Sequence, residues 1–130
     1  MSDALVSKVT PVLVVDDVEP CAQFWEKLGY TRGAEVPHAG KLGFVILNSA
    51  GIELMYQSLD SITADDAIMG GHLRSGGSSL YVEVADLDAA VRSVPDARIV
   101  VQPRKTFYGM RETGVLDPGG NIVLFAQKTG

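Results

Sequence analysis

Val-Leu-Val-Val-Asp-Asp-Val-Glu, residues 12–19, is followed closely by Cys-Ala-Gln-Phe-Trp at residues 21–25. A similar pattern returns at residues 81–88 as Tyr-Val-Glu-Val-Ala-Asp-Leu-Asp, followed by Ala-Ala-Val-Arg-Ser-Val. The two copies are offset by 69 residues, because Asp86 matches Asp17. Each copy is typical of a β-strand, an aspartate-capped turn and an amphipathic helix. The chain is therefore predicted to contain two similar half-modules, and a cleft between them is the expected place for function.

Length and composition limit the class of protein. The 130 residues, 46% hydrophobic and 21% charged, suit one compact domain over residues 1–130. No apolar run is long enough to cross a bilayer, and Met1–Ala4 does not begin a signal sequence, so a cytoplasmic protein without membrane contact is expected. The net charge of −5 and the lack of a basic cluster argue against nucleic-acid binding. The single Cys21 is expected to be a buried structural thiol.

The first half, residues 1–58, is predicted to begin with a strand at Lys8–Val15. A helix over Pro20–Leu28 follows, with apolar residues spaced three and four apart, and Gly29 ends it. Residues 33–40 are predicted to form a loop. Strands over 42–47 and 52–57 then form a hairpin around a turn at 48–51.

Residues 59–77 are predicted to be a flexible linker with one or two helical turns near 61–67. The second half, residues 78–130, is predicted to repeat the first. Its expected elements are a strand at 79–84, a helix at 87–94 and strands at 98–102, 112–116 and 121–127. Each half thus reads β-α-β-β-β, which predicts an α+β fold of two tandem modules forming a curved mixed sheet around a cleft, with the helices outside.

Two motifs resemble a known family. Val-Asp-Asp-Val-Glu at 15–19 with Phe-Trp-Glu-Lys-Leu-Gly-Tyr at 24–30 is similar to the start of a vicinal-oxygen-chelate module. Asp-Pro-Gly-Gly-Asn at 117–121 resembles that superfamily's closing turn. The superfamily includes glyoxalase I, extradiol dioxygenases, fosfomycin-modifying enzymes and bleomycin-resistance proteins. The resemblance implies the fold, whereas activity has to be argued from the site.

The resemblance also implies where a divalent metal would bind, because the family's enzymes hold it on the first and last strands of each module. The matching positions here are Thr10, Glu53, Ser79 and Leu124. Only Glu53 is an ordinary ligand, and Zn²⁺, Fe²⁺ or Ni²⁺ needs three or more N, S or O⁻ donors. His38 and His72 are predicted to lie in loops away from these positions. No metal and no other cofactor are therefore expected.

Strand alternation predicts the character of the cleft. An apolar set is expected to face inward, with a polar minority: Val12, Val14, Met55, Tyr81 and Leu124, then Thr10, Ser79, Glu53 and Glu83. A buried Glu53 or Glu83 would need a cation such as Arg104 or Arg111, or a donor on the ligand; otherwise both face solvent.

Phe107 and Tyr108 are predicted to form a lip that stacks on a flat ligand, in a stretch that resembles the aromatic-Gly-Met-Arg-Glu segment of bleomycin-resistance-like members. Core packing of Phe107 and Met110 is the alternative. The predicted ligand-binding residues are Glu53, Met55, Tyr81, Glu83, Phe107, Tyr108 and Arg111.

Three functions remain open at this point. The first is a metal-independent, antibiotic-type small-molecule binding protein, expected to be a homodimer and to take an uncharged or cationic, partly aromatic ligand. The second is a lyase, isomerase or dioxygenase with an atypical metal, or with Glu53 or Glu83 as a general base. The third is a regulatory or structural dimer whose cleft holds no ligand.

Overall fold

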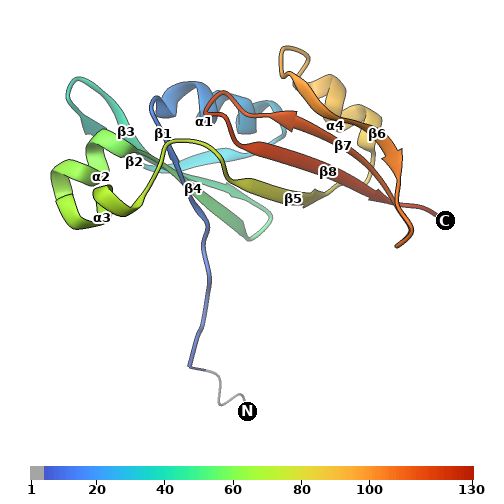
Figure 1. Ribbon diagram of the computed structural model, residues 1–130, viewed down its shortest axis with the longest axis horizontal. Helices are drawn as coiled ribbons and strands as arrows, with labels where there is room; N and C mark the ends of the chain where they lie inside the picture. Colours follow the sequence, from blue (N-terminus) through green and yellow to red (C-terminus); the bar gives the residue numbers. More distant parts are fainter. Residues whose placement is uncertain (1–4) are drawn as a thin grey trace.

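The computed structural model describes residues 5–130 as two four-stranded sheets, each with a helix, joined by a helical linker (Figure 1). The first half contains β1 (Val12–Val15), α1 (Val18–Lys27), β2 (Thr31–His38), β3 (Lys41–Ser49) and β4 (Ile52–Ser58). The second contains β5 (Ser79–Glu83), α4 (Leu87–Ser93), β6 (Ile99–Lys105), β7 (Met110–Leu116) and β8 (Ile122–Lys128).

Both sheets have the same strand order, β1-β4-β3-β2 and β5-β8-β7-β6. In each, the first strand pairs in parallel with the last, and the other pairs are antiparallel. The register keeps the 69-residue offset, because Val12 pairs with Met55 and Tyr81 pairs with Leu124. The predicted α+β fold of two tandem β-α-β-β-β modules is confirmed.

The two repeated helices begin where the aspartates predict. Asp86 Oδ1 accepts a hydrogen bond from the Ala89 amide at 3.0 Å at the start of α4. Asp17 occupies the same position before α1 but makes no side-chain capping bond. Gly29, at a φ of +95°, follows the end of α1 and takes a conformation that glycine adopts without strain.

Residues 33–40, predicted as a loop, lie mostly in strand β2, so that prediction is wrong. β2 is an exposed edge strand, paired with β3 on one side and shifted in register at two places. An edge strand can carry Gly33 and Pro37, since part of its backbone faces solvent. The repeat predicts this strand better than the local sequence does, because the offset of 69 residues matches β6 with residues 30–36.

The N-terminal strand and the linker also differ from expectation. β1 starts at Val12 rather than Lys8, and the Met55 amide donates to the carbonyl of Pro11 just before it. The linker is mainly helical, with α2 (Leu59–Asp65) and α3 (Ala67–His72). Ser58 and Asp66 cap these helices through their side-chain oxygens. None of the helices in residues 5–130 is long and apolar enough to span a membrane.

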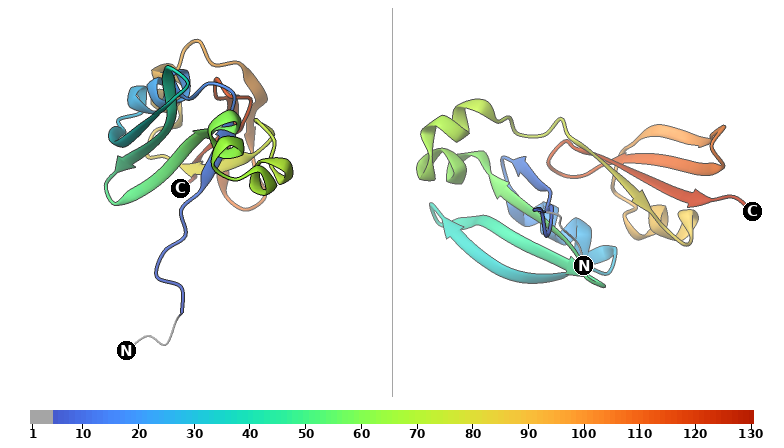
Figure 2. Two further views of the ribbon diagram at one scale, coloured as in Figure 1. Left: turned by 90° about the vertical axis from the view of Figure 1, so that its left-hand side faces the viewer. Right: turned by 90° about the horizontal axis from the view of Figure 1, so that it is seen from below.

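The hydrophobic core is continuous across both modules and lies between the sheets and their helices. Val15, Trp25 and Tyr56 contribute from the first module, and Val123 and Phe125 from the second, each less than 2% exposed. Helices α1 and α4 lie on the same side, whereas the N-terminal segment leaves the body on the opposite side (Figures 1 and 2). Each sheet therefore keeps one face that no helix covers.

A buried chain of hydrogen bonds ties the modules together. Trp25 Nε1 donates to Tyr56 Oη at 2.8 Å, and Tyr56 Oη donates to Asp117 Oδ2 at 2.6 Å. Asp117 lies in the turn between β7 and β8, where it also accepts from the amides of Gly119 and Asn121. The closing turn of the second module is thus anchored in the core of the first.

Gly119 lets this turn approach the first module closely. A Cβ at this position would lie 2.2 Å from Val15 Cγ1, nearer than real Cβ atoms come, and would also make a tight contact of 3.2 Å with Cys21 Sγ. Cys21 itself is fully buried, and burial raises the pKa of its thiol well above the ordinary value. This agrees with the prediction of a structural thiol.

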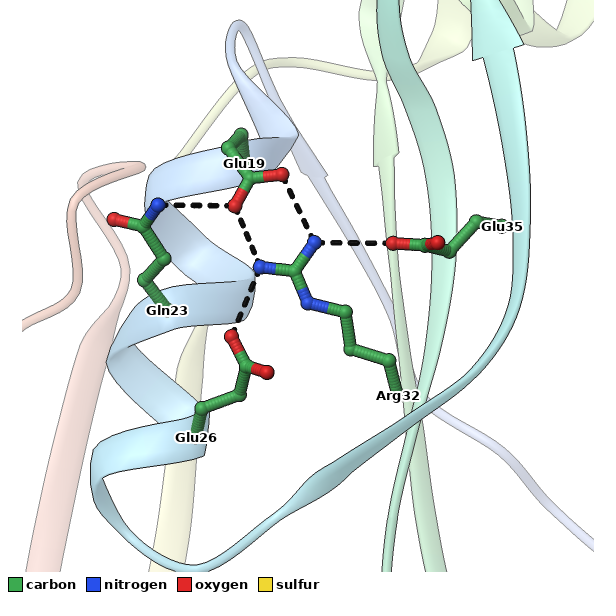
Figure 3. A network of polar contacts seen from close by, with 5 residues as sticks. All are labelled: Glu19, Gln23, Glu26, Arg32 and Glu35. Carbon is green, nitrogen blue, oxygen red and sulfur yellow. Dashed lines mark hydrogen bonds and ion pairs between the residues drawn. The ribbon is translucent and has the colours of Figure 1, made fainter.

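An ion-pair network fixes the edge strand β2 to α1 (Figure 3). Arg32 Nη1 donates to Glu19 Oε1 at 2.9 Å and to Glu35 Oε1 at 3.0 Å, and its Nη2 contacts Glu26 Oε1 at 2.9 Å. The Arg32 hydrogen bond is the main cause that lowers the pKa of Glu19. One guanidinium therefore holds three carboxylates from two elements together.

Candidate functional site

The uncovered faces of the two sheets carry the residues that alternation predicted to point inward. In the first sheet one row across the face is formed by Val12, Met55 and Ile46. The corresponding row of the second sheet is formed by Tyr81, Leu124 and Gly114. Met55, Ile46 and Leu124 are half-buried, and Val12 and Tyr81 are about half exposed. We call these two surfaces the open faces.

Glu112 lies on the second open face and is fully buried, and it was not among the predicted ligand-binding residues although it ends the aromatic-Gly-Met-Arg-Glu segment. Its Oε2 accepts from Tyr81 Oη at 2.6 Å and from Tyr108 Oη at 2.7 Å. Its Oε1 accepts from Arg104 Nη2 at 2.9 Å and from Arg104 Nε at 3.1 Å. We call these four residues the Glu112 cluster.

Charge and burial oppose each other within the Glu112 cluster. Burial acts to raise the pKa of Glu112, but the hydrogen bonds from Tyr81, Tyr108 and Arg104 outweigh it and leave that pKa below the ordinary value. The hydrogen bond to Glu112 is also the largest cause that raises the pKa of Tyr81 and of Tyr108. At neutral pH the cluster thus holds an ionised carboxylate beside two neutral phenols.

A second feature is a pocket of 580 Å³ between the modules, which lies where the β3–β4 turn approaches β5. Three predicted site residues, Glu53, Tyr81 and Glu83, line it together with apolar residues of both modules. Its volume falls in the range of about 300–1,000 Å³ usual for ligand pockets. The structure thus brings Glu53, Tyr81 and Glu83 to one place, as the cleft hypothesis requires.

Glu53 and Glu83 do not pair with the predicted cations, Arg104 and Arg111, but with lysines. Glu53 accepts from Lys8 Nζ at 2.9 Å, and Glu83 lies 3.9 Å from Lys128 Nζ. Arg104 binds Glu112 instead. Arg111 alternates with Glu112 along β7, so it points to the helix side, where it lies 3.9 Å from Asp88 of α4.

The predicted lip lies in the turn between β6 and β7. Phe107 is fully exposed and Tyr108 half exposed, and their rings meet edge to face with centroids 5.1 Å apart. Met110 is buried, so core packing applies to Met110 and not to Phe107. Arg104, Phe107 and Tyr108 line a further cavity of 340 Å³.

The sequence matches the model of the Glyoxalase/Bleomycin resistance protein/Dioxygenase superfamily over residues 7–125. The chain belongs to this superfamily. It has no significant match among curated proteins.

Several solved structures are similar to this chain in fold. A family enzyme from Burkholderia phytofirmans PsJN matches with a TM-score of 0.74 at 14% identity, covering 92% of this chain and 96% of that one. A glyoxalase/bleomycin resistance protein/dioxygenase from Nocardioides matches with 0.74 at 18% identity, covering 98% and 87%. TioX from Micromonospora sp. ML1 matches with 0.69 at 20% identity, covering 95% and 99%.

The register corrects one of the four metal positions of the superfamily enzymes. Leu124 pairs with Tyr81, and its counterpart in the first module is Met55, because Met55 pairs with Val12. Glu53 corresponds instead to Ile122, two residues earlier on the same face. The four positions are therefore Thr10, Met55, Ser79 and Leu124.

This donor set does not fit a divalent transition metal. It offers two hydroxyls, a thioether and a hydrocarbon in place of the imidazoles and carboxylates such metals require. Within residues 5–130, no three His, Cys, Asp or Glu side chains gather closely enough to hold a metal ion. His38 ends β2 beside Asp60, at 3.0 Å, and His72 ends α3.

Proposed function

We propose that this superfamily member is a metal-independent, antibiotic-type small-molecule binding protein. The observation that supports this most is the chemistry of the open faces. Apolar and aromatic side chains occupy them, while Thr10, Met55, Ser79 and Leu124 stand at the four metal positions. Mostly apolar walls with a few placed polar groups are typical of small-molecule sites. A cytoplasmic location, where a drug would be intercepted inside the cell, is part of the proposal.

The proposal includes a homodimer. Phe44, Ile46 and Met55 leave apolar surface on the first open face of a single chain, and β1 and β5 are edge strands of their sheets. Association would cover both kinds of surface. Sedimentation equilibrium should give the mass of two chains. A monomeric mass over a wide range of protein concentration would contradict this part.

No observation favours the enzymatic alternative over binding. A general base has to reach the proton that it removes, and Glu53 and Glu83 each have a lysine close by. Glu112 is ionised but sealed beneath its four hydrogen-bond donors. We therefore put forward no catalytic residue.

Two measurements test the proposed function. Elemental analysis of protein purified without chelator should show no stoichiometric Zn, Fe, Ni or Mn. A thermal-shift screen across drugs should find compounds that raise the melting temperature, because a ligand that binds only the folded state stabilises it.

A matched pair of variants places the bound compound. Tyr81→Ala, on the open face, should weaken binding of a compound found in the screen by about tenfold, the order expected for losing a stacked ring and its hydrogen bond. Arg111→Ala, on the helix side, should leave it unchanged. Stoichiometric metal would refute metal independence, and failure of every compound to bind would refute the binding function.

A further inference from the structure

The Glu112 carboxylate uses all of its acceptor capacity inside the protein. A carboxylate offers about four lone-pair sites, and Tyr81, Tyr108 and two nitrogens of Arg104 supply four donors. The side chain has no exposed surface. A ligand therefore cannot contact Glu112 directly. Glu112 can influence a ligand only through the residues that it holds, Tyr81, Tyr108 and Arg104.

The surrounding sheet is shaped so that Tyr81 can reach Glu112. β8 lies between β5 and β7, so the Tyr81 side chain has to cross it. Ala126 of β8, the residue paired with Glu112, is small and fully buried. The small side chain of Ala126 therefore leaves room for the Tyr81 ring to cross β8.

Glu112 thereby fixes both phenols by their hydroxyl ends, while both side chains stay partly exposed. Tyr81 and Tyr108 are each 51% exposed. They come from elements far apart in the chain, β5 and the β6–β7 turn, yet their hydroxyls meet on one oxygen atom. Two aromatic rings with one shared anchor form a preorganised surface for a flat ring, which needs little ordering when the ligand arrives.

The polar groups that remain available beside these rings are donors. Arg104 uses Nε and Nη2 on Glu112, and within the described residues its Nη1 makes no hydrogen bond. Its side chain is 52% exposed. The carboxylates of this region are already matched, Glu112 by Arg104, Glu53 by Lys8 and Glu83 by Lys128. A ligand would therefore find N–H groups to bond its oxygens, and no carboxylate without a cation beside it.

We propose that the Glu112 cluster binds a planar aromatic compound carrying a carbonyl or carboxylate oxygen. Tyr81 and Tyr108 stack on the ring, Arg104 donates to the oxygen, and Glu112 is the positioning residue that holds all three. This inference rests on the proposed small-molecule function and narrows its ligand class. It favours oxygen-bearing aromatics over aromatic cations.

Three matched probes test the class of ligand: 2-naphthoate, 2-acetylnaphthalene and 2-naphthylmethylammonium. Each is titrated into the full chain with ¹³C-labelled tyrosine rings, and the ring resonances are followed by NMR. The first two should move the Tyr81 and Tyr108 signals and bind at least about tenfold more tightly than the ammonium compound, the order of one charge-assisted hydrogen bond.

The outcomes separate this inference from the proposed function. Equal or tighter binding of the ammonium compound would overturn the ligand class. Binding that moves only other resonances would overturn the site but leave a small-molecule function in place. If no probe binds, the inference fails, while a compound from the drug screen would still uphold the proposed function.

Variants test the roles within the cluster. Glu112→Gln keeps the shape but replaces one acceptor oxygen by a donor, so naphthoate affinity should fall by about tenfold. In the same variant Tyr81 and Tyr108 should ionise at lower pH by ultraviolet titration, because Glu112 raises the pKa of both. An unchanged phenol titration would overturn the positioning role.

A second pair keeps the test decisive if Glu112→Gln does not fold. Arg104→Met removes the donor, so 2-naphthoate should lose its advantage over 2-naphthylmethylammonium while the rings still stack. Arg111→Met, on the opposite side of β7, is the control and should leave the preference as it was. A preference that survives Arg104→Met would overturn the role of Arg104.

Discussion

The turn that closes the second module and its counterpart in the first lie in opposite environments. Gly119 packs against Val15 and Cys21 of the other module, with no space for a Cβ. The offset of 69 residues makes Ala50 its counterpart, and the turn around Ala50 is exposed, with Ile52 61% exposed. The 580 Å³ pocket lies where this second turn approaches β5. The turn of the second module thus packs tightly against the first module, whereas the equivalent turn of the first module borders the pocket.

The buried polar network shows the same asymmetry. Tyr56 and Trp25 carry the hydrogen bonds that reach Asp117, whereas their counterparts in the second module are Phe125 and Val94. A single fold can therefore tie its modules through one polar contact and leave the equivalent position apolar. The following variants compare the contacts between the modules with matched positions elsewhere in the chain, beginning with the largest expected effect.

Gly119→Ala should destabilise the protein most. The new Cβ would overlap Val15, and overpacking of this kind lowers the free energy of unfolding by about 3 kcal/mol at its upper range. Urea denaturation measures the change. Ala50→Gly, at the counterpart position with a φ of +49°, should stay within about 0.5 kcal/mol of the parent. Similar effects at both positions would mean that the two turns are equivalent after all.

Tyr56→Phe should lower the free energy of unfolding by about 2 kcal/mol, the cost of leaving a buried donor or acceptor without its partner. The variant leaves the Trp25 indole N–H without its acceptor and removes one donor from Asp117. Tyr30→Phe is the control, because Tyr30 also packs against Trp25 but makes no side-chain hydrogen bond among the described residues. Equal losses in the two variants would refute a special role for the network.

Arg32→Met should cost about 1 kcal/mol, because a network of partly exposed ion pairs contributes more than an isolated pair. Three carboxylates would then face one another on α1 and β2. Arg111→Met is the matched control in the second module. It should change stability by less than about 0.5 kcal/mol, since Arg111 and Asp88 are 3.9 Å apart and exposed.

The contribution of Arg32 should also depend on pH. The folded-state pKa of Glu19 is lowered, so this stabilisation is fully present above the ordinary carboxyl pKa of about 4.3 and is lost as the pH falls through the lower folded value. The difference in unfolding midpoint between the parent and Arg32→Met should therefore be present at pH 7 and shrink as the pH falls below about 4.3. A difference that does not shrink on acidification would contradict the ion-pair explanation.

Most of the fold could be predicted from the sequence, because the repeated strand–turn–helix pattern marks the start of each module. The strand and helix around each capping aspartate, the hairpins and the inward-facing alternation follow from local patterns. β2 did not, because its polar, Gly- and Pro-containing sequence becomes a strand only through pairing with β3. The metal position at Met55 could have been found from the repeat, because the offset of 69 residues matches Met55 with Leu124, and the pairing of β1 with β4 agrees with that match.

The candidate site was less predictable. Tyr81 and Tyr108 could be named as aromatic residues beside strands. Their common anchor could not, since Tyr81 and Glu112 are 31 residues apart and meet across an intervening strand. Alternation along β7 does place Glu112 on the open face, but only its partners explain why an ionised residue is fully buried there.

The position of Trp25 gives this protein a spectroscopic property. It is the only tryptophan in the chain, and its indole N–H ends the hydrogen-bond chain that runs through Tyr56 to the closing turn of the second module. Fluorescence excited at the red edge of the absorption band therefore comes from Trp25 alone, beside the contact between the two modules, which we call the seam. Separation of the halves would hydrate that indole and move its emission to longer wavelength, so an unlabelled sample reports on the seam.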